Sequence, residues 1–157
     1  MITLGLLSDT HGVLLPEVLE ALDGVDEILH AGDIGGNDVL TPLRSLAPVT
    51  AVLGNMDPFV SALPAERVLE RGSHRLLLIH DMGGLHGPSS DVLTRAHTDG
   101  VTVVVHGHTH RPTDGQWHGI RFVNPGSAGH PRGGHPATVA RMTLRGAEVH
   151  VEHVALD

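Results

Sequence analysis

The sequence of 157 residues contains no cysteine, no tyrosine and no lysine, and aromatic residues make up only 2% of it. The absence of cysteine excludes disulfide bonds, zinc sites built on thiolates and cysteine nucleophiles. No segment approaches the about 18 consecutive apolar residues of a membrane span, and no basic segment of the kind that opens a secretory signal precedes the first apolar run. We therefore predict a cytoplasmic protein with no membrane partner.

Positive charge is also scarce. All the basic residues are arginine, and the formal net charge is −8 at pH 7. A protein that follows the phosphate backbone of nucleic acid needs clustered Lys and Arg, so we expect no nucleic-acid partner larger than a small nucleotide. A small phosphoester is compatible with this charge when metal ions supply the positive charge.

Histidine is present in excess, with 14 copies in 157 residues. The length fits one domain, and we predict a single domain over residues 1–157. A chain of this size buries roughly 68–70% of the surface that its unfolded form exposes, so it needs no structural metal in order to fold. The histidines therefore require another explanation.

Apolar strands alternate with helical patterns along the first two thirds of the chain, which predicts an α/β layered fold. Ile2–Leu7 is a continuous apolar run, typical of a strand buried on both faces. Further strands are expected at 27–31, 49–53 and 101–106, and a hairpin at 67–69 and 75–80. Helices are expected at 16–22, 37–46 and 89–97. The last third contains only strand-like segments, at 121–124, 136–144 and 148–154, and predicts an antiparallel meander.

Five of the predicted strands are followed by Asp, Asn or His. In α/β sheets, ligands bind in the crevice at the carboxyl ends of the strands, so we expect seven side chains to converge on one site. They are Asp9, His11, Asp33, Asn55, His80, His108 and His110.

The donor types at these positions predict a metal centre. Imidazole, carboxylate and amide oxygen bind divalent ions such as Mn, Fe, Zn, Co and Ni. Seven donors exceed the needs of one tetrahedral ion but suit two ions about 3.5–4 Å apart that share a carboxylate and keep positions open for water. An open site of this kind is catalytic rather than structural. We therefore expect two divalent ions as cofactors, with manganese preferred.

Five short motifs occur in order along the chain: Asp9-Thr10-His11, Gly32-Asp33, Gly54-Asn55-Met56-Asp57, His80 and Gly107-His108-Thr109-His110. Each motif alone is common, but the ordered set resembles the signature of calcineurin-like metallophosphoesterases. A further segment, Asn124-Pro125-Gly126-Ser127, is similar to one in the small YfcE-like phosphodiesterase branch. The resemblance implies a four-layer αββα sandwich in which two mixed β-sheets pack face to face with helices outside.

The resemblance also implies an activity and a role for each ligand. The reaction would be hydrolysis of a phosphoester, a diester more readily than a monoester, by a metal-bridging hydroxide that attacks phosphorus in line. One metal would be held by Asp9, His11 and His110. The other would be held by Asn55, His80 and His108. Asp33 would bridge both metals. The predicted catalytic residues are Asp33, Asn55 and His108.

The chain departs from larger members of the family at Met56, where those members commonly have a histidine that acts as general acid for the leaving group. A thioether cannot transfer a proton, so substrates with good leaving groups are expected. Asp57 and His86 are candidate replacements for the acid, and the loop 81–90 is a candidate wall of the substrate pocket.

Other polar residues receive a structural interpretation. His30 is expected to orient a ligand by a hydrogen bond, and His106 to end a strand without binding metal. Arg111 and Arg132 are best placed to meet a phosphate, although we interpret both as surface charges. Surface positions are expected for His74, His97, His118, His130, His135, His150 and His153. Core or interface positions are expected for Trp117 and Phe122.

Two alternatives to an enzyme stay open. A non-catalytic protein-binding scaffold of the same fold is suggested by a eukaryotic trafficking subunit that resembles one, but such a member would be expected to lose ligands. A metal-storage protein would not need its ligands at successive strand ends. In addition, apolar residues near Pro58 and Pro64 (Phe59, Val60 and Leu63) form a candidate patch for a homo-oligomer.

Overall fold

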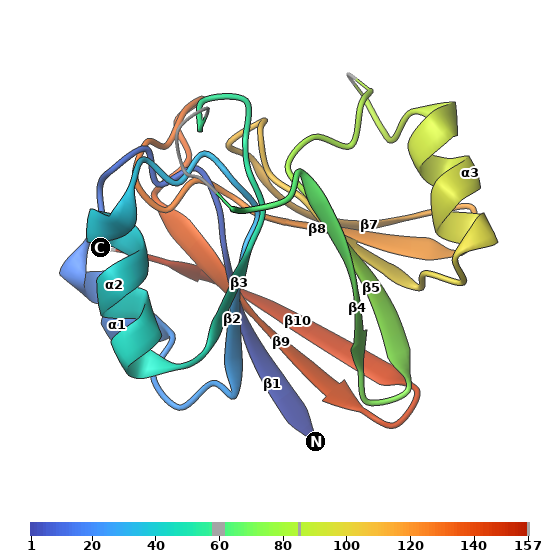
Figure 1. Cartoon of the computed structure of the whole chain (residues 1–157), viewed down its shortest axis with the longest axis horizontal. Coiled ribbons are helices and arrows are strands. Elements are labelled where there is room, and N and C mark those ends of the chain that lie inside the picture. Colours follow the sequence, from blue (N-terminus) through green and yellow to red (C-terminus); the bar gives the residue numbers. More distant parts are fainter. Residues whose placement is uncertain (58–61, 85, 157) are drawn as a thin grey trace.

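Two five-stranded β-sheets pack face to face, and helices lie on their outer sides (Figure 1). The computed structural model describes residues 1–57, 62–84 and 86–156. In the described part of the chain, no helix is long and apolar enough to cross a membrane.

The first sheet has the strand order β10-β9-β1-β2-β3. Its strands are β1 (Ile2–Leu7), β2 (Glu27–His30), β3 (Val49–Ala51), β9 (Thr138–Arg145) and β10 (Glu148–Ala155). The first three strands are parallel, whereas β9 runs antiparallel to both β1 and β10. The sheet is therefore mixed, with its parallel half built from the N-terminal third of the chain.

The second sheet has the order β4-β5-β6-β8-β7. Its strands are β4 (Glu66–Arg71), β5 (His74–Ile79), β6 (Val103–Val105), β7 (Pro112–Trp117) and β8 (Ile120–Pro125). The pairs β5–β6 and β6–β8 are parallel, and the hairpins β4–β5 and β7–β8 are antiparallel. The expected hairpin at 67–80 is thus confirmed.

The helices begin at residues suited to that place. α1 (Pro16–Ala21) starts with proline, whose missing N–H is not needed in the first turn. α2 spans Asn37–Leu46. α3 (Ser90–Thr98) is capped by Ser89, whose hydroxyl accepts a hydrogen bond from the N–H of Val92. All three helices lie within two residues of their predicted bounds.

Three apolar clusters fill the spaces between four layers. Val18 of α1 and Leu40 of α2 pack with Ile28 on the outer face of the first sheet. A second cluster, which includes Leu6 and Leu78, lies between the sheets. A third joins Val92 and Ala96 of α3 to Leu77, Val104 and Phe122. Alternate residues of one strand thus enter different clusters, and the predicted αββα sandwich is confirmed.

The predicted meander in the last third is wrong. β8 belongs to the second sheet and pairs with β6 and β7, whereas β9 and β10 form a hairpin in the first sheet. The sequence pattern did not reveal β7, because this edge strand is polar and mostly exposed. β8 therefore had no visible antiparallel partner in the sequence.

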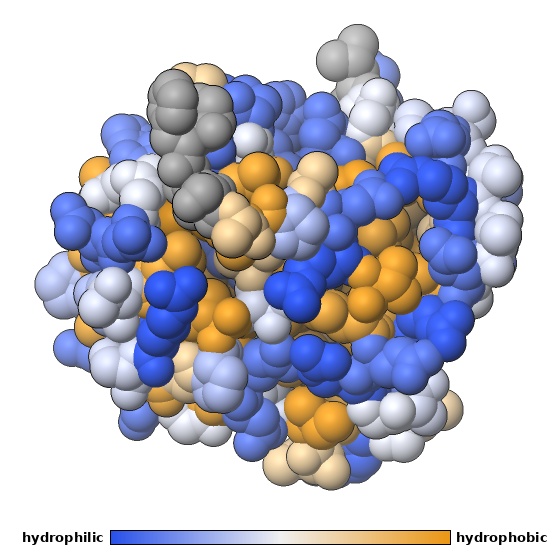
Figure 2. Space-filling model, in the orientation of Figure 1, coloured by the Kyte–Doolittle hydropathy of each residue, from blue (hydrophilic) through white to orange (hydrophobic). Residues whose placement is uncertain are grey.

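The outer face of the second sheet is only partly covered. Figure 2 shows apolar side chains gathered in a hollow between the β4–β5 hairpin and α3. Val68 of β4 is 45% exposed, and Ile79 and Leu93 are only partly buried. The single helix α3 is too short to cover the sheet as α1 and α2 together cover the first one.

Candidate metal centre

Loops from both sheets meet at the carboxyl ends of the parallel strands, at the top of Figure 1. Within the first sheet, the N–H of Asp9 donates to the carbonyl of Gly32 at 3.0 Å. Between the sheets, His80 Nδ1 lies 2.7 Å from the carbonyl oxygen of Ala31. The N–H of His108 donates to Asp9 Oδ2 at 3.0 Å. The two sheets therefore supply one continuous site, as expected from the strand ends.

Five of the predicted ligands have a left-handed backbone conformation. Their φ angles are 55° at Asp9, 48° at His11, 55° at Asp33, 73° at His108 and 64° at His110. Residues other than glycine rarely adopt positive φ, and such strained positions cluster at functional sites. The loops thus hold these side chains at a cost in free energy, which points to a functional reason for their position.

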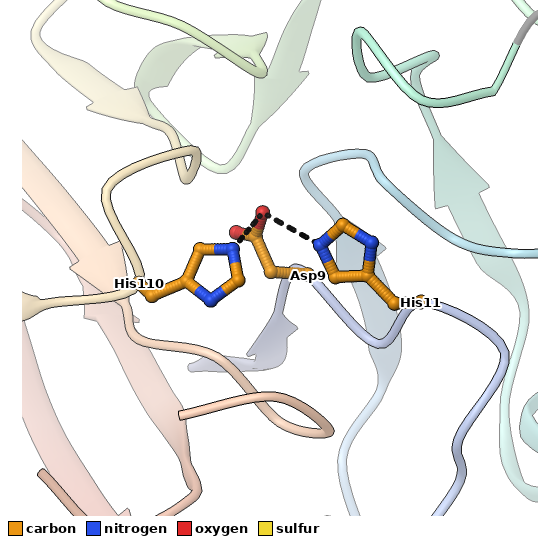
Figure 3. Close-up of side chains that lie close together, drawn as sticks. All are labelled: Asp9, His11 and His110. Atoms are coloured by element: carbon orange, nitrogen blue, oxygen red, sulfur yellow. Dashed lines mark ion pairs between the residues drawn. The ribbon is translucent and has the colours of Figure 1, made fainter. Parts of the chain in front are cut away.

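Asp9 lies at the centre of the cluster (Figure 3). Its Oδ2 accepts a 2.7 Å hydrogen bond from the hydroxyl of Ser8 as well as the bond from the His108 N–H. Its Oδ1 lies 3.2 Å from His110 Nε2, 3.7 Å from His11 Nε2 and 3.8 Å from His80 Nε2. One carboxylate oxygen thus faces three imidazole nitrogens.

Asp33 lies between two of these histidines. Its Oδ1 accepts a hydrogen bond from the N–H of Met56 at 2.8 Å. Its Oδ2 lies 3.5 Å from His11 Nε2 and 3.3 Å from His80 Nε2. A carboxylate in this position can reach two neighbouring ions, each with its own histidine.

The polar atoms of this cluster fit divalent metal ions. Asp9 Oδ1, His11 Nε2 and His80 Nε2 are buried and have no hydrogen-bond partner among the described residues. Buried polar groups in proteins are almost always paired, so these three atoms require a ligand. Two groups of side chains have ligand atoms within 4.8 Å of one another: Asp9, His11 and His110, and Asp9, Asp33 and His80.

The protonation of the histidines agrees with this fit. His80 Nδ1 faces the Ala31 carbonyl, and His110 Nδ1 lies 2.5 Å from the carbonyl oxygen of His130. A proton on each Nδ1 leaves the lone pair of Nε2 free to bind an ion, which is the usual arrangement of metal-binding histidines. Burial also lowers the pKa of His11, against the opposing effect of Asp33 and Asp9, and so favours its neutral form.

Asn55 and His108 stand apart from the two groups. Both residues are exposed, with 43% of the His108 side chain accessible. The His108 ring nevertheless lies 5.2 Å from that of His80 in an edge-to-face arrangement, and its Nε2 lies 3.8 Å from Asp81 Oδ2. The structure thus brings five of the seven predicted ligands into the cluster and places His108 at its border.

Two glycines allow the backbone to approach the carboxylates. A Cβ on Gly54 would lie 2.1 Å from Asp33 Oδ1. A Cβ on Gly107 would lie 2.0 Å from Ser8 Oγ and 2.6 Å from Asp9 Oδ2. Any larger residue at either position would displace a predicted ligand or the group that holds it.

His30 supports the loops from beneath, but its ring contacts Gly32 and Thr10 rather than a predicted ligand, so the expected hydrogen bond to a ligand is wrong. Its Nδ1 accepts a hydrogen bond from the N–H of Gly32 at 3.1 Å, and its Nε2 lies 3.0 Å from the hydroxyl of Thr10. That hydroxyl donates in turn to the carbonyl of Ile34 at 2.7 Å. Burial lowers the pKa of His30 to about 3, so the ring is neutral and suited to accept at one nitrogen and donate at the other.

Asp57 has a structural role that the sequence did not reveal. The buried carboxylate accepts hydrogen bonds from the N–H groups of Ile34 at 2.9 Å, Gly35 at 3.2 Å and Gly54 at 3.0 Å. These bonds tie the loop after β3 to the loop after β2. Both carboxylate oxygens are thus occupied in holding backbone N–H groups, which argues against Asp57 as the general acid. His86, the other candidate, is exposed.

The segment from Asn124 to Ser127 links the last third of the chain to the site. The Ser127 hydroxyl donates to the carbonyl of Asp9 at 2.8 Å and accepts from the N–H of His130 at 2.8 Å. The Asn124 amide donates to the carbonyl of Gly107 at 3.1 Å. His130 is exposed as expected, but its ring lies 5.4 Å from that of His11.

Several other expectations have clear outcomes. Arg111 and Arg132 are exposed, as predicted. His74 is not on the surface: it is buried, and its Nε2 lies 2.8 Å from the carbonyl of Gly146. Trp117 is 41% exposed, so it is not a core residue and its interface position stays a prediction, whereas Phe122 is buried.

The candidate self-association patch is only partly described. Its residues 58–61 lie outside the described residues, and Leu63 packs against the core.

Comparison with known proteins gives three kinds of similarity. Residues 2–147 match the calcineurin-like phosphoesterase superfamily domain. The chain is 38% identical over 135 residues to a probable metallophosphoesterase of Methanothermobacter thermautotrophicus, covering 82% of this chain and 78% of that protein. It is 32% identical over 168 residues to the phosphodiesterase YfcE of Escherichia coli K12, covering 90% and 88%.

A solved structure shares the arrangement of strands and helices. The crystal structure of Vps29 from Chaetomium thermophilum superposes with a TM-score of 0.81 at 22% sequence identity, covering 99% of this chain and 96% of that one. At this level of identity the similarity concerns the fold alone.

Proposed function

Because this chain belongs to the calcineurin-like phosphoesterase superfamily, we propose that it is a phosphodiesterase that depends on two divalent metal ions. The observation that carries the proposal is a set of three buried atoms at the strand ends, one carboxylate oxygen and two imidazole nitrogens, that have no hydrogen-bond partner in the part of the chain that the structure describes. The relatives named as metallophosphoesterase and phosphodiesterase support the class of reaction.

Each proposed set of ligands combines residues from both sheets. Asp9, His11 and His110 would hold one ion. Asn55, His80 and His108 would hold the other. Asp33 would be shared, because its Oδ2 lies between His11 Nε2 and His80 Nε2. When bound, two divalent ions lower the pKa of water and neutralise charge on the phosphoryl oxygens.

Electrostatics makes the ions necessary for an anionic substrate. Asp9 and Asp33 are both buried, and the histidines beside them are neutral in the metal-binding form. The cluster by itself is therefore negative and would repel a phosphodiester. Two divalent ions reverse the sign of the local charge. We propose manganese as the preferred ion, with Fe, Zn, Ni or Co as alternatives for the same donor set.

The residues at the border of the cluster would meet the substrate. Asn55 and His108 are exposed, so each can donate a hydrogen bond to a phosphoryl oxygen as charge develops there. Met56 is 63% exposed beside Asn55 and cannot protonate a leaving group. Substrates with good leaving groups should therefore react best. We place the activity in the cytoplasm and on small phosphoesters, and a homo-oligomer stays a prediction.

The test is hydrolysis of bis(4-nitrophenyl) phosphate by chelator-treated protein with and without Mn²⁺. We expect Mn²⁺ to restore the rate and Asp33→Asn to abolish it, because the amide removes the shared charge. Asp23→Asn, at an exposed turn outside the site, is the matched control and should retain the wild-type rate. A wild-type rate in Asp33→Asn, or no rate in folded protein with any of several divalent ions, would contradict the proposal.

A protein-binding module is the second candidate function. The fold similarity to Vps29, a protein named for vacuolar protein sorting, favours it. The positive φ angles and the unpartnered ligand atoms favour the enzyme, because a binding surface has no need of either. A protein that binds its full complement of metal ions but hydrolyses no diester would support the protein-binding module instead.

A further inference from the structure

A cavity of about 200 Å³ lies beside the proposed metal centre, on the outer face of the second sheet. Its walls are the segment after β5, the strands β7 and β8, and the end of β6, where His106 precedes the proposed ligand His108 by two residues. Asp81, near His108 on the metal side, is followed by Met82, which lines this side cavity. The two sites thus share one wall.

Two of the three Trp and Phe side chains of the sequence line the side cavity. The chain has one Trp, two Phe and no Tyr, and both Trp117 and Phe122 line this space. The indole of Trp117 packs directly on Gly87, where an added Cβ would lie 2.6 Å from the ring. Phe122 and Met82 form the apolar floor. Flat apolar walls of this kind favour stacking with a planar ligand.

A polar group is buried in the same wall. The His106 side chain is 2% exposed, and its ring lies edge-to-face with Phe122 at 6.1 Å. Its Nδ1 is buried without a hydrogen-bond partner in the part of the chain that the structure describes. Buried ring nitrogens are almost always paired, so the imidazole has unused capacity to bind a ligand at this position.

The size of the side cavity restricts the ligand. Drug-sized ligands occupy pockets of roughly 300–1,000 Å³, so a smaller space suits a single ring. Gly115 pairs with Phe122 across the β7–β8 register and therefore faces the same side of the sheet. An added Cβ at Gly115 would meet no atom within 4 Å. A side chain at this position would fill the space that the ring requires.

We propose that the side cavity binds an aromatic or heteroaromatic ring carried by one ester group of the phosphodiester substrate. His106 would donate to or accept from a polar atom of that ring, and Trp117 and Phe122 would contact its faces and edge. This inference rests on the proposed function, since the metal centre would hold the phosphate of the same molecule. It makes the substrate a diester with a single-ring ester group, such as a pyrimidine or a substituted phenyl.

The first test compares two substrates with the same leaving group. Phenyl 4-nitrophenyl phosphate and methyl 4-nitrophenyl phosphate both release 4-nitrophenolate and differ only in the second ester group. We expect the Mn²⁺-loaded protein to prefer the phenyl ester in kcat/KM by at least about tenfold. Gly115→Leu should bring the ratio close to one. Gln116→Leu, which places the same side chain on the opposite face of β7, should keep the wild-type ratio.

A second readout does not depend on hydrolysis. Trp117 is the only tryptophan, so its indole N–H gives one signal in a nitrogen–proton correlation spectrum. Phenol carries no charge, so the negative metal-free cluster does not repel it. Phenol added to metal-free protein should shift this signal in a saturable way, and methanol should not. Gly115→Leu should weaken the binding of phenol at least about tenfold.

The two readouts separate failure of the inference from failure of the proposed function. A ring-dependent indole shift without any hydrolysis would support the side cavity and contradict the enzyme. Hydrolysis of both esters by wild-type protein with equal kcat/KM would overturn the inference. So would a Gly115→Leu variant that keeps the wild-type ratio of phenyl to methyl kcat/KM, whether its activity is unchanged or falls equally for both esters. Absence of the indole shift in wild-type protein would overturn it as well.

Discussion

The two ends of the sandwich both contain buried histidines, and their hydrogen bonding differs. At the carboxyl ends of the parallel strands, His11 and His80 each have a buried Nε2 without a partner among the described residues. At the opposite end, the Nε2 of His74 lies 2.8 Å from the Gly146 carbonyl and its Nδ1 lies 3.4 Å from the Thr102 hydroxyl. The same residue type therefore has a ring nitrogen free of described partners at one end, as a metal ligand requires, and is tied to protein groups at the other.

Cavity size does not distinguish the ends. A cavity of about 400 Å³ at the opposite end is lined by His74 and Arg121. Arg121 forms an ion pair with Asp114 at 2.8 Å and also bonds to the carbonyl of Val149. The charged and imidazole groups of this larger cavity are thus satisfied by the protein. Unsatisfied donors and acceptors, rather than open space, mark the functional end.

The largest contrast should come from Asp9→Asn. The substitution removes a charge that the metals need, so kcat/KM should fall by about 10³-fold or more. The amide can donate to His110 Nε2, which faces Oδ1 at 3.2 Å, so the metal-free variant should fold at least as stably as wild type. Diester kinetics together with urea unfolding in chelator check both parts. Near wild-type turnover would contradict the assignment.

Metal ions should stabilise the folded protein through the strand-end site that contains Asp9. At a free metal concentration of 100 times the dissociation constant, a ligand that binds the folded state alone adds about 2.7 kcal/mol to the free energy of unfolding. Thermal unfolding with Mn²⁺ and with chelator should show this difference in wild-type protein and lose it in Asp9→Asn. An equal gain in both proteins would mean that Mn²⁺ binds elsewhere.

His74→Leu should have the reverse effect of Asp9→Asn, because it should lower the free energy of unfolding and leave the activity nearly unchanged. The substitution removes the hydrogen bond between His74 and the Gly146 carbonyl, which keeps its bond from the Ser73 hydroxyl at 3.1 Å, so it should cost about 0.5–1.5 kcal/mol of unfolding free energy. Because His74 lies at the other end of β5 from His80, kcat/KM should stay within about twofold of wild type. A large loss of activity in folded protein would contradict the division between the ends.

A further expected effect concerns the pH dependence of stability. Burial lowers the pKa of His30 from 6.5 to about 3, so the unfolded chain binds a proton in this window that the folded chain does not. The free energy of unfolding in chelator should therefore rise as pH increases from 3 to 6.5, and His30 should contribute up to about 1.4 kcal/mol per pH unit to this rise. Above pH 6.5 both states bind no proton at His30, and this contribution stops changing.

His30→Asn tests this effect, because an amide oxygen can still accept from the Gly32 N–H without titrating. The slope of unfolding free energy against pH should decrease by up to one proton in the variant. An unchanged slope would show that His30 does not carry this pH dependence.

The N-terminal half of the fold was predictable because each element had a clear apolar pattern, either continuous or at helical spacing. The apolar run Ile2–Leu7 and the helical pattern of Asn37–Leu46 occur in the structure with the same bounds. β7 was not predictable, because Pro112–Trp117 is an edge strand whose residues remain mostly exposed. Which sheet β8 joins depends on contacts between distant segments, and these leave no mark in a local pattern.

The residues of the candidate site were predictable, but the contacts that hold its loops in place were not. Asp9, Asp33 and the histidines follow strands, so topology brings them together. The three backbone bonds to Asp57 and the position of His130 beside His11 depend on loop geometry that one sequence does not encode locally. The Gly54-Asn55-Met56-Asp57 turn was the only signal for Asp57, and it suggested an acid.

Calorimetric titration of Mn²⁺ into chelator-treated protein tests the central claim most directly. The unpartnered atoms of the functional end predict two tightly bound ions per chain in the wild-type protein and loss of this tight pair in Asp9→Asn. No tight binding to folded wild-type protein, or many weakly bound ions without a tight pair, would contradict the assignment of these strand ends as a metal centre.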